Sequence, residues 1–133
     1  MTTKLIINYS DYHTLLTELV YQIKKSSILK KVKYIYTFIR GGLPIATHLS
    51  HFFDRPMLIH NNEIDLSTIP CGEMLVADDV ADTGKTLDGF QFLFPTATLF
   101  YKPRSIVEPS FYALKTTKWI VFPWERPDEE INR

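Results

Sequence analysis

A chain of 133 residues has the length of one domain and is short for two. Hydrophobic residues make up 45% and charged residues 23%, which excludes disorder, collagen and coiled coil as its main state. Its 15 basic and 15 acidic side chains cancel, so the chain lacks the general basic surface on which nucleic-acid binding depends. We expect a single domain over residues 1–133 that binds no nucleic acid.

The charges are unevenly distributed along the chain. Residues 1–40 carry seven basic and two acidic side chains, whereas residues 54–91 carry two basic and eight acidic ones. The basic N-terminal third leaves one alternative open, a regulator that binds nucleic acid through this segment. The acidic middle indicates that carboxylates gather in one part of the molecule.

Cysteine content and hydropathy indicate the compartment. The single cysteine, Cys71, cannot form an internal disulfide and fits a reducing environment. No apolar run approaches the roughly 18 residues of a membrane-spanning helix. The apolar stretch at the start is too short for a signal peptide. We therefore expect a cytoplasmic protein with no membrane contact.

Segments with strand and helix character alternate along the chain. Ser10 is the expected N-cap of the first helix, with Asp11 in its first turn. In chain order we expect a strand at 4–7, a helix at 10–25, a strand at 34–39, a helix at 44–53, a strand at 56–59, a loop at 61–72, a strand at 73–77, a helix at 85–94, and strands at 96–101 and 119–122. This alternation predicts an α/β fold with a mostly parallel sheet flanked by helices.

Three polar loops follow predicted strands, at residues 40–42, 78–86 and 102–104. Ligands of open parallel sheets bind beyond the carboxyl ends of the strands. The three loops should therefore meet at one edge of the sheet and form the functional site there.

The most informative segment is residues 75–87, Leu-Val-Ala-Asp-Asp-Val-Ala-Asp-Thr-Gly-Lys-Thr-Leu. An apolar strand delivers Asp78 and Asp79 to the sheet edge, and Thr-Gly-Lys-Thr then opens the predicted helix. The N-terminus of a helix attracts phosphate, and Gly84 lets the backbone approach it closely. Paired carboxylates suit a sugar diol and a hard cation such as Mg²⁺. Together these features predict a site for a phosphorylated ribose.

A nucleotide-hydrolysing P-loop is the competing interpretation of this segment. Gly84, Lys85 and Thr86 match the end of the pattern Gly-x4-Gly-Lys-[Ser/Thr]. The first glycine of that pattern would stand at position 79, which is Asp79. Two carboxylates there would repel nucleotide phosphates, so we reject the P-loop.

Residues 75–87 resemble, throughout their thirteen positions, the phosphoribosyl pyrophosphate (PRPP) signature of type I phosphoribosyltransferases. Residues 38–44 resemble the pyrophosphate loop of this family, and residues 101–103 resemble the segment whose lysine contacts the exocyclic oxygen of a 6-oxopurine. Residues 119–125 resemble the base-stacking segment of xanthine–guanine phosphoribosyltransferases. The resemblance covers about residues 4–126.

This resemblance implies an enzyme that transfers the phosphoribosyl group of PRPP to guanine, xanthine or hypoxanthine, giving a nucleoside monophosphate and pyrophosphate. Asp78 and Asp79 would hold the ribose hydroxyls directly or through Mg²⁺, and Asp82 would be the general acid or base near the purine. The implied PRPP-binding residues are Asp78, Asp79, Asp82, Thr83, Gly84, Lys85, Thr86, Arg40 and Gly41, and the implied base-binding residues are Lys102, Ile120 and Trp124.

The family pattern carries further expectations. It implies a non-proline cis peptide near Ile39–Arg40 and a homodimer or homotetramer. Its flexible hood loop is reduced here to about residues 60–72, without the usual Ser-Tyr pair, and a polar tail covers about residues 127–133. The short hood leaves open a non-catalytic PRPP- or nucleotide-binding regulator. A phosphoribosyltransferase for another base is the remaining alternative.

Overall fold

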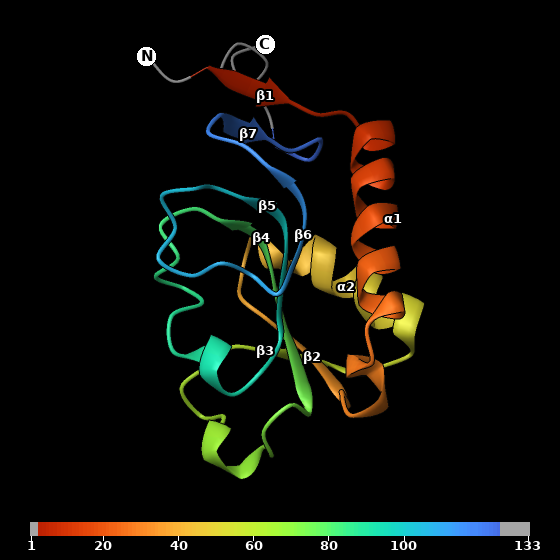
Figure 1. The fold of residues 1–133 in the computed structure, drawn as a ribbon, viewed down its shortest axis with the longest axis vertical. Coiled ribbons are helices and arrows are strands. Elements are labelled where there is room, and N and C mark those ends of the chain that lie inside the picture. Colours follow the sequence, from red (N-terminus) through yellow and green to blue (C-terminus); the bar gives the residue numbers. More distant parts are fainter. Residues whose placement is uncertain (1–2, 126–133) are drawn as a thin grey trace.

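The structure is a computed structural model that describes residues 3–125, and its elements follow the alternation predicted from the sequence (Figure 1). A five-stranded sheet has the order β3-β2-β4-β5-β6, and β1 pairs with β7 in a separate two-stranded ribbon. Every pairing is parallel, which confirms the predicted fold class. The strands are β1 (Lys4–Ile6), β2 (Tyr34–Thr37), β3 (Met57–Ile59), β4 (Met74–Ala81), β5 (Thr96–Tyr101), β6 (Phe111–Lys115) and β7 (Trp119–Val121), and the helices are α1 (Tyr9–Lys25) and α2 (Gly42–Phe53).

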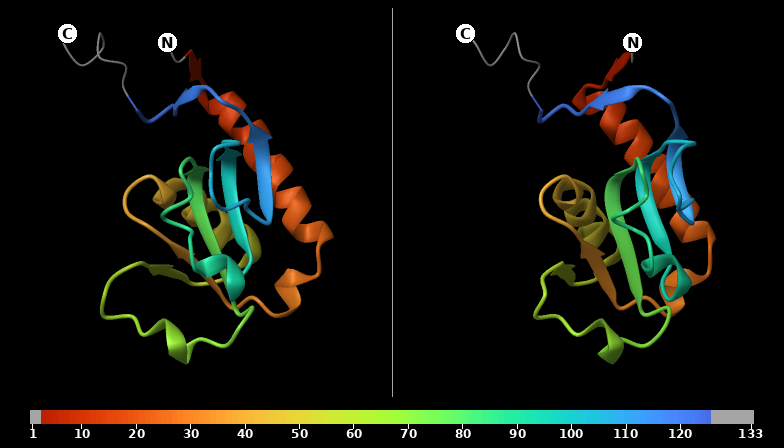
Figure 2. Two further views of the ribbon diagram at one scale, coloured as in Figure 1. Left: turned by 60° about the vertical axis from the view of Figure 1, so that its left-hand side comes forward. Right: turned by 90° about the vertical axis from the view of Figure 1, so that its left-hand side faces the viewer.

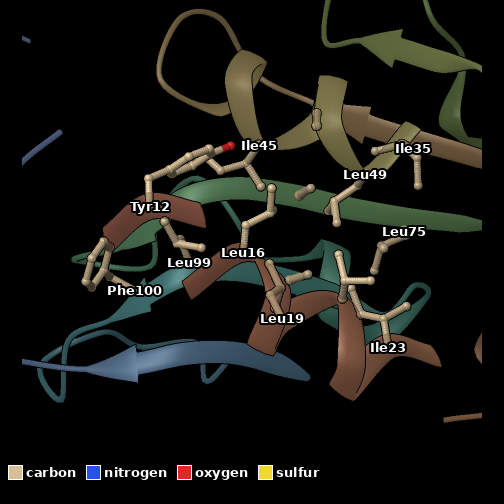
Figure 3. Packing of buried hydrophobic residues seen from close by; sticks show 14 of the residues in the cluster. Tyr12, Leu16, Leu19, Ile23, Ile35, Ile45, Leu49, Leu75, Leu99 and Phe100 are labelled. Carbon is tan, nitrogen blue, oxygen red and sulfur yellow. The ribbon is translucent and has the colours of Figure 1, made fainter. Parts of the chain in front are cut away.

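The main core lies between one face of the sheet and both α-helices. Alternate residues of β4, such as Leu75 and Ala77, point into this core together with Leu19 of α1 and Leu49 of α2, all fully buried (Figure 3). Helix α1 covers β5 and β6, and α2 covers β2 and β4. The opposite residues of β4 face a second, smaller core.

The predicted helix at 85–94 is wrong, and the second core is covered by turns instead. Leu87, Phe90 and Phe94 have helical spacing, and all three do pack against this face of the sheet. Gly89 adopts a positive φ of 101°, however, which interrupts the chain between them. Only a 3₁₀ turn, Phe90–Phe92, forms there. The phosphate site therefore cannot rest on the N-terminus of a helix.

Smaller differences from the prediction concern the start of α1, the end of β4 and the strand β6. Asn8, rather than Ser10, caps α1, because its side chain accepts from the Asp11 N–H while the Asp11 carboxylate accepts from the Asn8 N–H. Strand β4 continues past the predicted end at residue 77 to Ala81, so the acidic pair lies within the strand. Strand β6 was not predicted from the sequence.

The topology brings the functional segments to one end of the molecule. The carboxyl ends of β4 and β5 point toward the β1–β7 ribbon, which lies beyond them (Figures 1 and 2). Residues 60–72 form the predicted loop, with one 3₁₀ turn at Leu66–Thr68, and return to the opposite end, where the Gly72 N–H donates to the Leu93 carbonyl at 2.8 Å. None of the helices within residues 3–125 is long and apolar enough to cross a membrane.

Candidate active site

A cavity of about 280 Å³ opens where β4 and β5 end beneath the β1–β7 ribbon. Six of the residues predicted for the site line it: Asp78, Asp79, Asp82, Thr86, Lys102 and Ile120. The remaining lining residues are Val80, Trp119, Phe122 and Glu125. The motif that resembles a PRPP signature and the segment that resembles a base-stacking segment thus share one cavity.

The acidic pair, Asp78 and Asp79, lines this cavity. Asp78 is only 8% exposed, and its Oδ1 accepts from the Asp79 N–H at 2.9 Å. The Asp79 Oδ1 accepts in turn from the Val80 N–H at 2.8 Å. Burial, and then the neighbouring Asp79 carboxylate, raise the pKa of Asp78 to about 8. Ionisation of both carboxyls of the pair is therefore unfavourable unless a cation binds beside them.

The chemistry of the acidic pair fits Mg²⁺. Neither Asp78 nor Asp79 forms an ion pair with another residue in the described part of the chain. Across residues 3–125, no three His, Cys, Asp or Glu side chains cluster closely enough to hold a metal by themselves. Mg²⁺ typically binds through one or two carboxylates and completes its shell with water and substrate phosphates. The pair supplies this kind of partial shell.

The Arg40–Gly41 loop passes directly beside the acidic pair. Its Ile39–Arg40 peptide is cis, as the resemblance implied. Gly41 packs so tightly against the Asp79 carboxylate that any side chain there would collide with it. A β-carbon on Gly42 would likewise collide with the Thr37 hydroxyl. The two glycines therefore allow this loop to approach the carboxylates, and the Arg40 side chain is exposed to solvent.

The segment after Asp82 is a turn with free backbone donors. Its one hydrogen bond of helical type joins the Asp88 N–H to the Gly84 carbonyl at 3.0 Å. Gly84 has a positive φ of 86° and leaves no room for a side chain beside Ser105. The N–H groups of Gly84 and Thr86 donate to no other residue between 3 and 125. The Lys85 N–H between them donates to the Thr83 Oγ1 at 3.3 Å. Free N–H groups in a turn can bind an anion, so a phosphate can still be held here.

Asp82 lines the same cavity as the acidic pair and contacts two cationic side chains. The Arg104 Nε and Nη2 donate to its Oδ1 at 2.8 and 2.5 Å, and the Lys102 Nζ lies 3.6 Å from the same oxygen. Lys102 is 6% exposed, so it is a buried charge at the cavity wall. Arg104 was missed from the sequence, where its only signal is a basic side chain in a loop predicted to reach this edge.

Trp119 stands beside Lys102, with the Lys102 Nζ 5.2 Å from the centre of its ring. Trp124 lies elsewhere. It stacks on Phe122 at 4.9 Å, meets the Tyr12 ring edge-on at 5.1 Å, and lines a separate apolar cavity of about 520 Å³. Of the two tryptophans, the structure thus places Trp119 in the candidate site. Trp119 belongs to strand β7, whereas Trp124 lies in the turn that follows this strand.

Known proteins resemble this chain in sequence and in fold. No protein-family model matches it. A xanthine-guanine phosphoribosyltransferase of Cereibacter sphaeroides is 37% identical over an aligned stretch of 57 residues, which covers 39% of this chain. The match spans about a third of the length of that relative, 34%.

Several solved structures match nearly the whole chain, and two of them are phosphoribosyltransferases. A purine phosphoribosyltransferase from Pyrococcus horikoshii is 28% identical with a TM-score of 0.74, and the match covers 93% of this chain and 95% of that one. A xanthine-guanine-hypoxanthine phosphoribosyltransferase of Helicobacter pylori has a TM-score of 0.80 at 19% identity, over 99% of both chains. The second match concerns the fold alone.

Proposed function

We propose that this chain, which has the fold of type I phosphoribosyltransferases and resembles their purine-specific members in sequence, transfers the 5-phosphoribosyl group of PRPP to a 6-oxopurine. The observation that carries the proposal is one cavity with three kinds of group in it. These groups are an acidic pair, the Asp82 carboxylate, and a buried lysine beside an exposed tryptophan.

PRPP would lie across the carboxyl ends of β4 and β2. The turn at residues 82–86 would bind the 5-phosphate through its backbone N–H groups and the Thr83 and Thr86 hydroxyls. Asp78 and Asp79 would hold the ribose hydroxyls or Mg²⁺. Arg40 and the Gly41 N–H would bind the pyrophosphate, since their loop touches the Asp79 carboxylate. Mg²⁺, when bound, would neutralise charge on the pyrophosphate as it departs.

The purine would lie against the wall formed by Lys102 and β7. The Lys102 ammonium would donate a hydrogen bond to the exocyclic oxygen of a 6-oxopurine. An amino group at that position cannot accept this hydrogen bond. The Trp119 ring would cover one face of the base, and the Ile120 backbone would contact its edge. The position of Trp124 behind Phe122 supports a packing role for it, with Trp119 taking the stacking role.

The reaction breaks the bond between C1 and the pyrophosphate oxygen, and both electrons leave with the pyrophosphate. A purine nitrogen then forms the new bond to C1, which carries positive charge in the transition state as in glycoside chemistry. The proton that this nitrogen loses would pass to the Asp82 carboxylate and then to water. Arg40 would stabilise the negative charge of the leaving group.

A panel of bases tests this proposal. Purified protein with PRPP and Mg²⁺ should release pyrophosphate with guanine, xanthine or hypoxanthine, and should release much less with adenine or orotate. Turnover with adenine or orotate alone would move the protein to another base class. PRPP binding without turnover of any base would leave the regulator that the open cavity favours, since no residue of the 60–72 loop lines it.

We also propose a homodimer or homotetramer that acts in the cytoplasm. The exposed apolar side chains Tyr9, Ile39 and Phe52 support self-association, because at least half of each side chain faces solvent in the single chain. The single cysteine supports a reducing compartment. Light scattering on the purified protein measures the assembly, and a monomer at micromolar concentration would contradict it.

A further inference from the structure

Among the described residues, both cationic side chains that contact Asp82 do so at the same carboxylate oxygen, Oδ1. This oxygen accepts two hydrogen bonds from Arg104, at 2.8 and 2.5 Å, and lies 3.6 Å from the Lys102 Nζ. No hydrogen bond joins Oδ2 to another residue in the described range 3–125. The two oxygens of one carboxylate are therefore in different situations, one bound and one free.

The Lys102 side chain is mostly buried, but its ammonium still reaches the cavity and makes no hydrogen bond to a described residue. The side chain is 7% exposed, yet no described group lies within hydrogen-bonding distance of Nζ, and its neighbours are the Asp82 carboxylate and the Trp119 ring. A mostly buried ammonium without a partner is costly, and direct contact with a carboxylate would offset part of that cost. Asp82 is close enough to supply that contact, but the oxygen nearest to Lys102 is already bound to Arg104.

Arg104 reaches Asp82 from outside the candidate site. It lines a neighbouring cavity of about 470 Å³, and Lys102 and Trp119 form the wall between this cavity and the first one. The Arg104 side chain is 64% exposed. Exposed ion pairs contribute little to folding stability. A role in stability therefore does not account for this contact, and Arg104 does not line the first cavity itself.

We propose that Arg104 is a positioning residue that keeps Asp82 and Lys102 apart. By binding Oδ1 it prevents the buried Lys102 ammonium and the partly exposed Asp82 carboxylate from approaching to hydrogen-bonding distance. Lys102 then stays available for the oxygen of an incoming base, and the Asp82 Oδ2 stays free to accept a proton. This inference rests on the proposed function, which assigns those tasks to Lys102 and Asp82.

Removal of Arg104 should make both Lys102 and the Asp82 Oδ2 less available to the substrates. In Arg104→Ala, we expect kcat/KM for guanine to fall by about tenfold or more, as for other residues that orient a ligand-binding group. Discrimination between guanine and adenine should fall as well, because Lys102 turns toward Asp82. The KM for PRPP should stay within about twofold, since Arg104 touches none of the proposed PRPP-binding groups except Asp82.

Three controls separate positioning from a general loss of charge or fold. Arg104→Lys keeps one donor and should retain part of the activity. Guanidinium ion added to Arg104→Ala should restore part of it by occupying the vacated position. Lys118→Ala removes an exposed positive charge from the loop before Trp119 without removing a contact to Asp82, and should behave like the wild type.

A structural measurement decides the inference without relying on turnover. In a crystal structure of Arg104→Ala, the Lys102 Nζ should approach Asp82 to hydrogen-bonding distance, closer than the present 3.6 Å. An unchanged distance would overturn the inference, as would unchanged base kinetics in an active enzyme or an equal loss of PRPP binding. If the wild type turns over no purine, the proposed function fails, and the Lys102–Asp82 distance in the variant still decides the role of Arg104.

Discussion

Replacing Asp78 by asparagine should stabilise the metal-free protein at neutral pH. Asp78 is 8% exposed, and burial, followed by the charge of Asp79, raises the pKa of its carboxyl from 3.8 to about 8. The unfolded chain releases this proton near pH 4, whereas the folded chain holds it until near pH 8. Folding stability therefore falls as the pH rises through this window, by about 4 kcal/mol at pH 7.

Asparagine has the shape of aspartate, can still accept from the Asp79 N–H, and carries no proton to lose. Urea unfolding in EDTA should show that Asp78→Asn gains stability over the wild type, and that the gain grows from pH 5 to pH 7.5. Asp88→Asn, the same change at an exposed position outside the cavity, should show no such trend. A gain for Asp78→Asn that is absent, or equal at both pH values, would refute the burial argument. Mg²⁺ should stabilise the wild type and have less effect on the variant.

The remaining predictions concern Lys102 and Trp119, which we propose to contact the base, and Trp124, which we propose to have a packing role. Trp119→Ala should raise the KM for guanine by about tenfold or more through loss of stacking on the base. Trp124→Ala should lower the melting temperature and leave that KM nearly unchanged. Steady-state kinetics and calorimetry measure the two quantities. The opposite pattern would return the stacking role to Trp124. Lys102→Ala should reduce discrimination between guanine and adenine in competition assays, and full retention of discrimination would place base recognition elsewhere.

Motifs at strand ends were the features most open to prediction from the sequence. Asp78 and Asp79 follow a buried apolar run, and Lys102 follows the next one, so parallel pairing of β4 with β5 alone brings them to one edge. Their meeting in one cavity requires no knowledge of how side chains pack. This is why the fold class could be predicted from local pattern, whereas the six lining residues were implied as a set by the resemblance to phosphoribosyltransferases.

Other features depend on contacts that local pattern does not contain. Leu87, Phe90 and Phe94 repeat as in a helix, but their spacing reflects packing against the sheet through turns around Gly89. The pairing of Arg104 with Asp82 joins residues 22 positions apart in two loops. Both features follow from tertiary packing, which overrides the helical periodicity and decides which of several basic side chains reaches a given carboxylate.

The most direct test of the account is the rate at which guanine and PRPP yield nucleoside monophosphate, measured side by side for the wild type, Asp82→Asn and Asp88→Asn. Asp82 lines the cavity with the acidic pair and Lys102, whereas Asp88 is exposed outside it. We expect turnover by the wild type and by Asp88→Asn. For Asp82→Asn with its fold intact, we expect kcat to fall by about 100-fold or more. Equal rates for all three proteins, or no product from the folded wild type, would contradict the account.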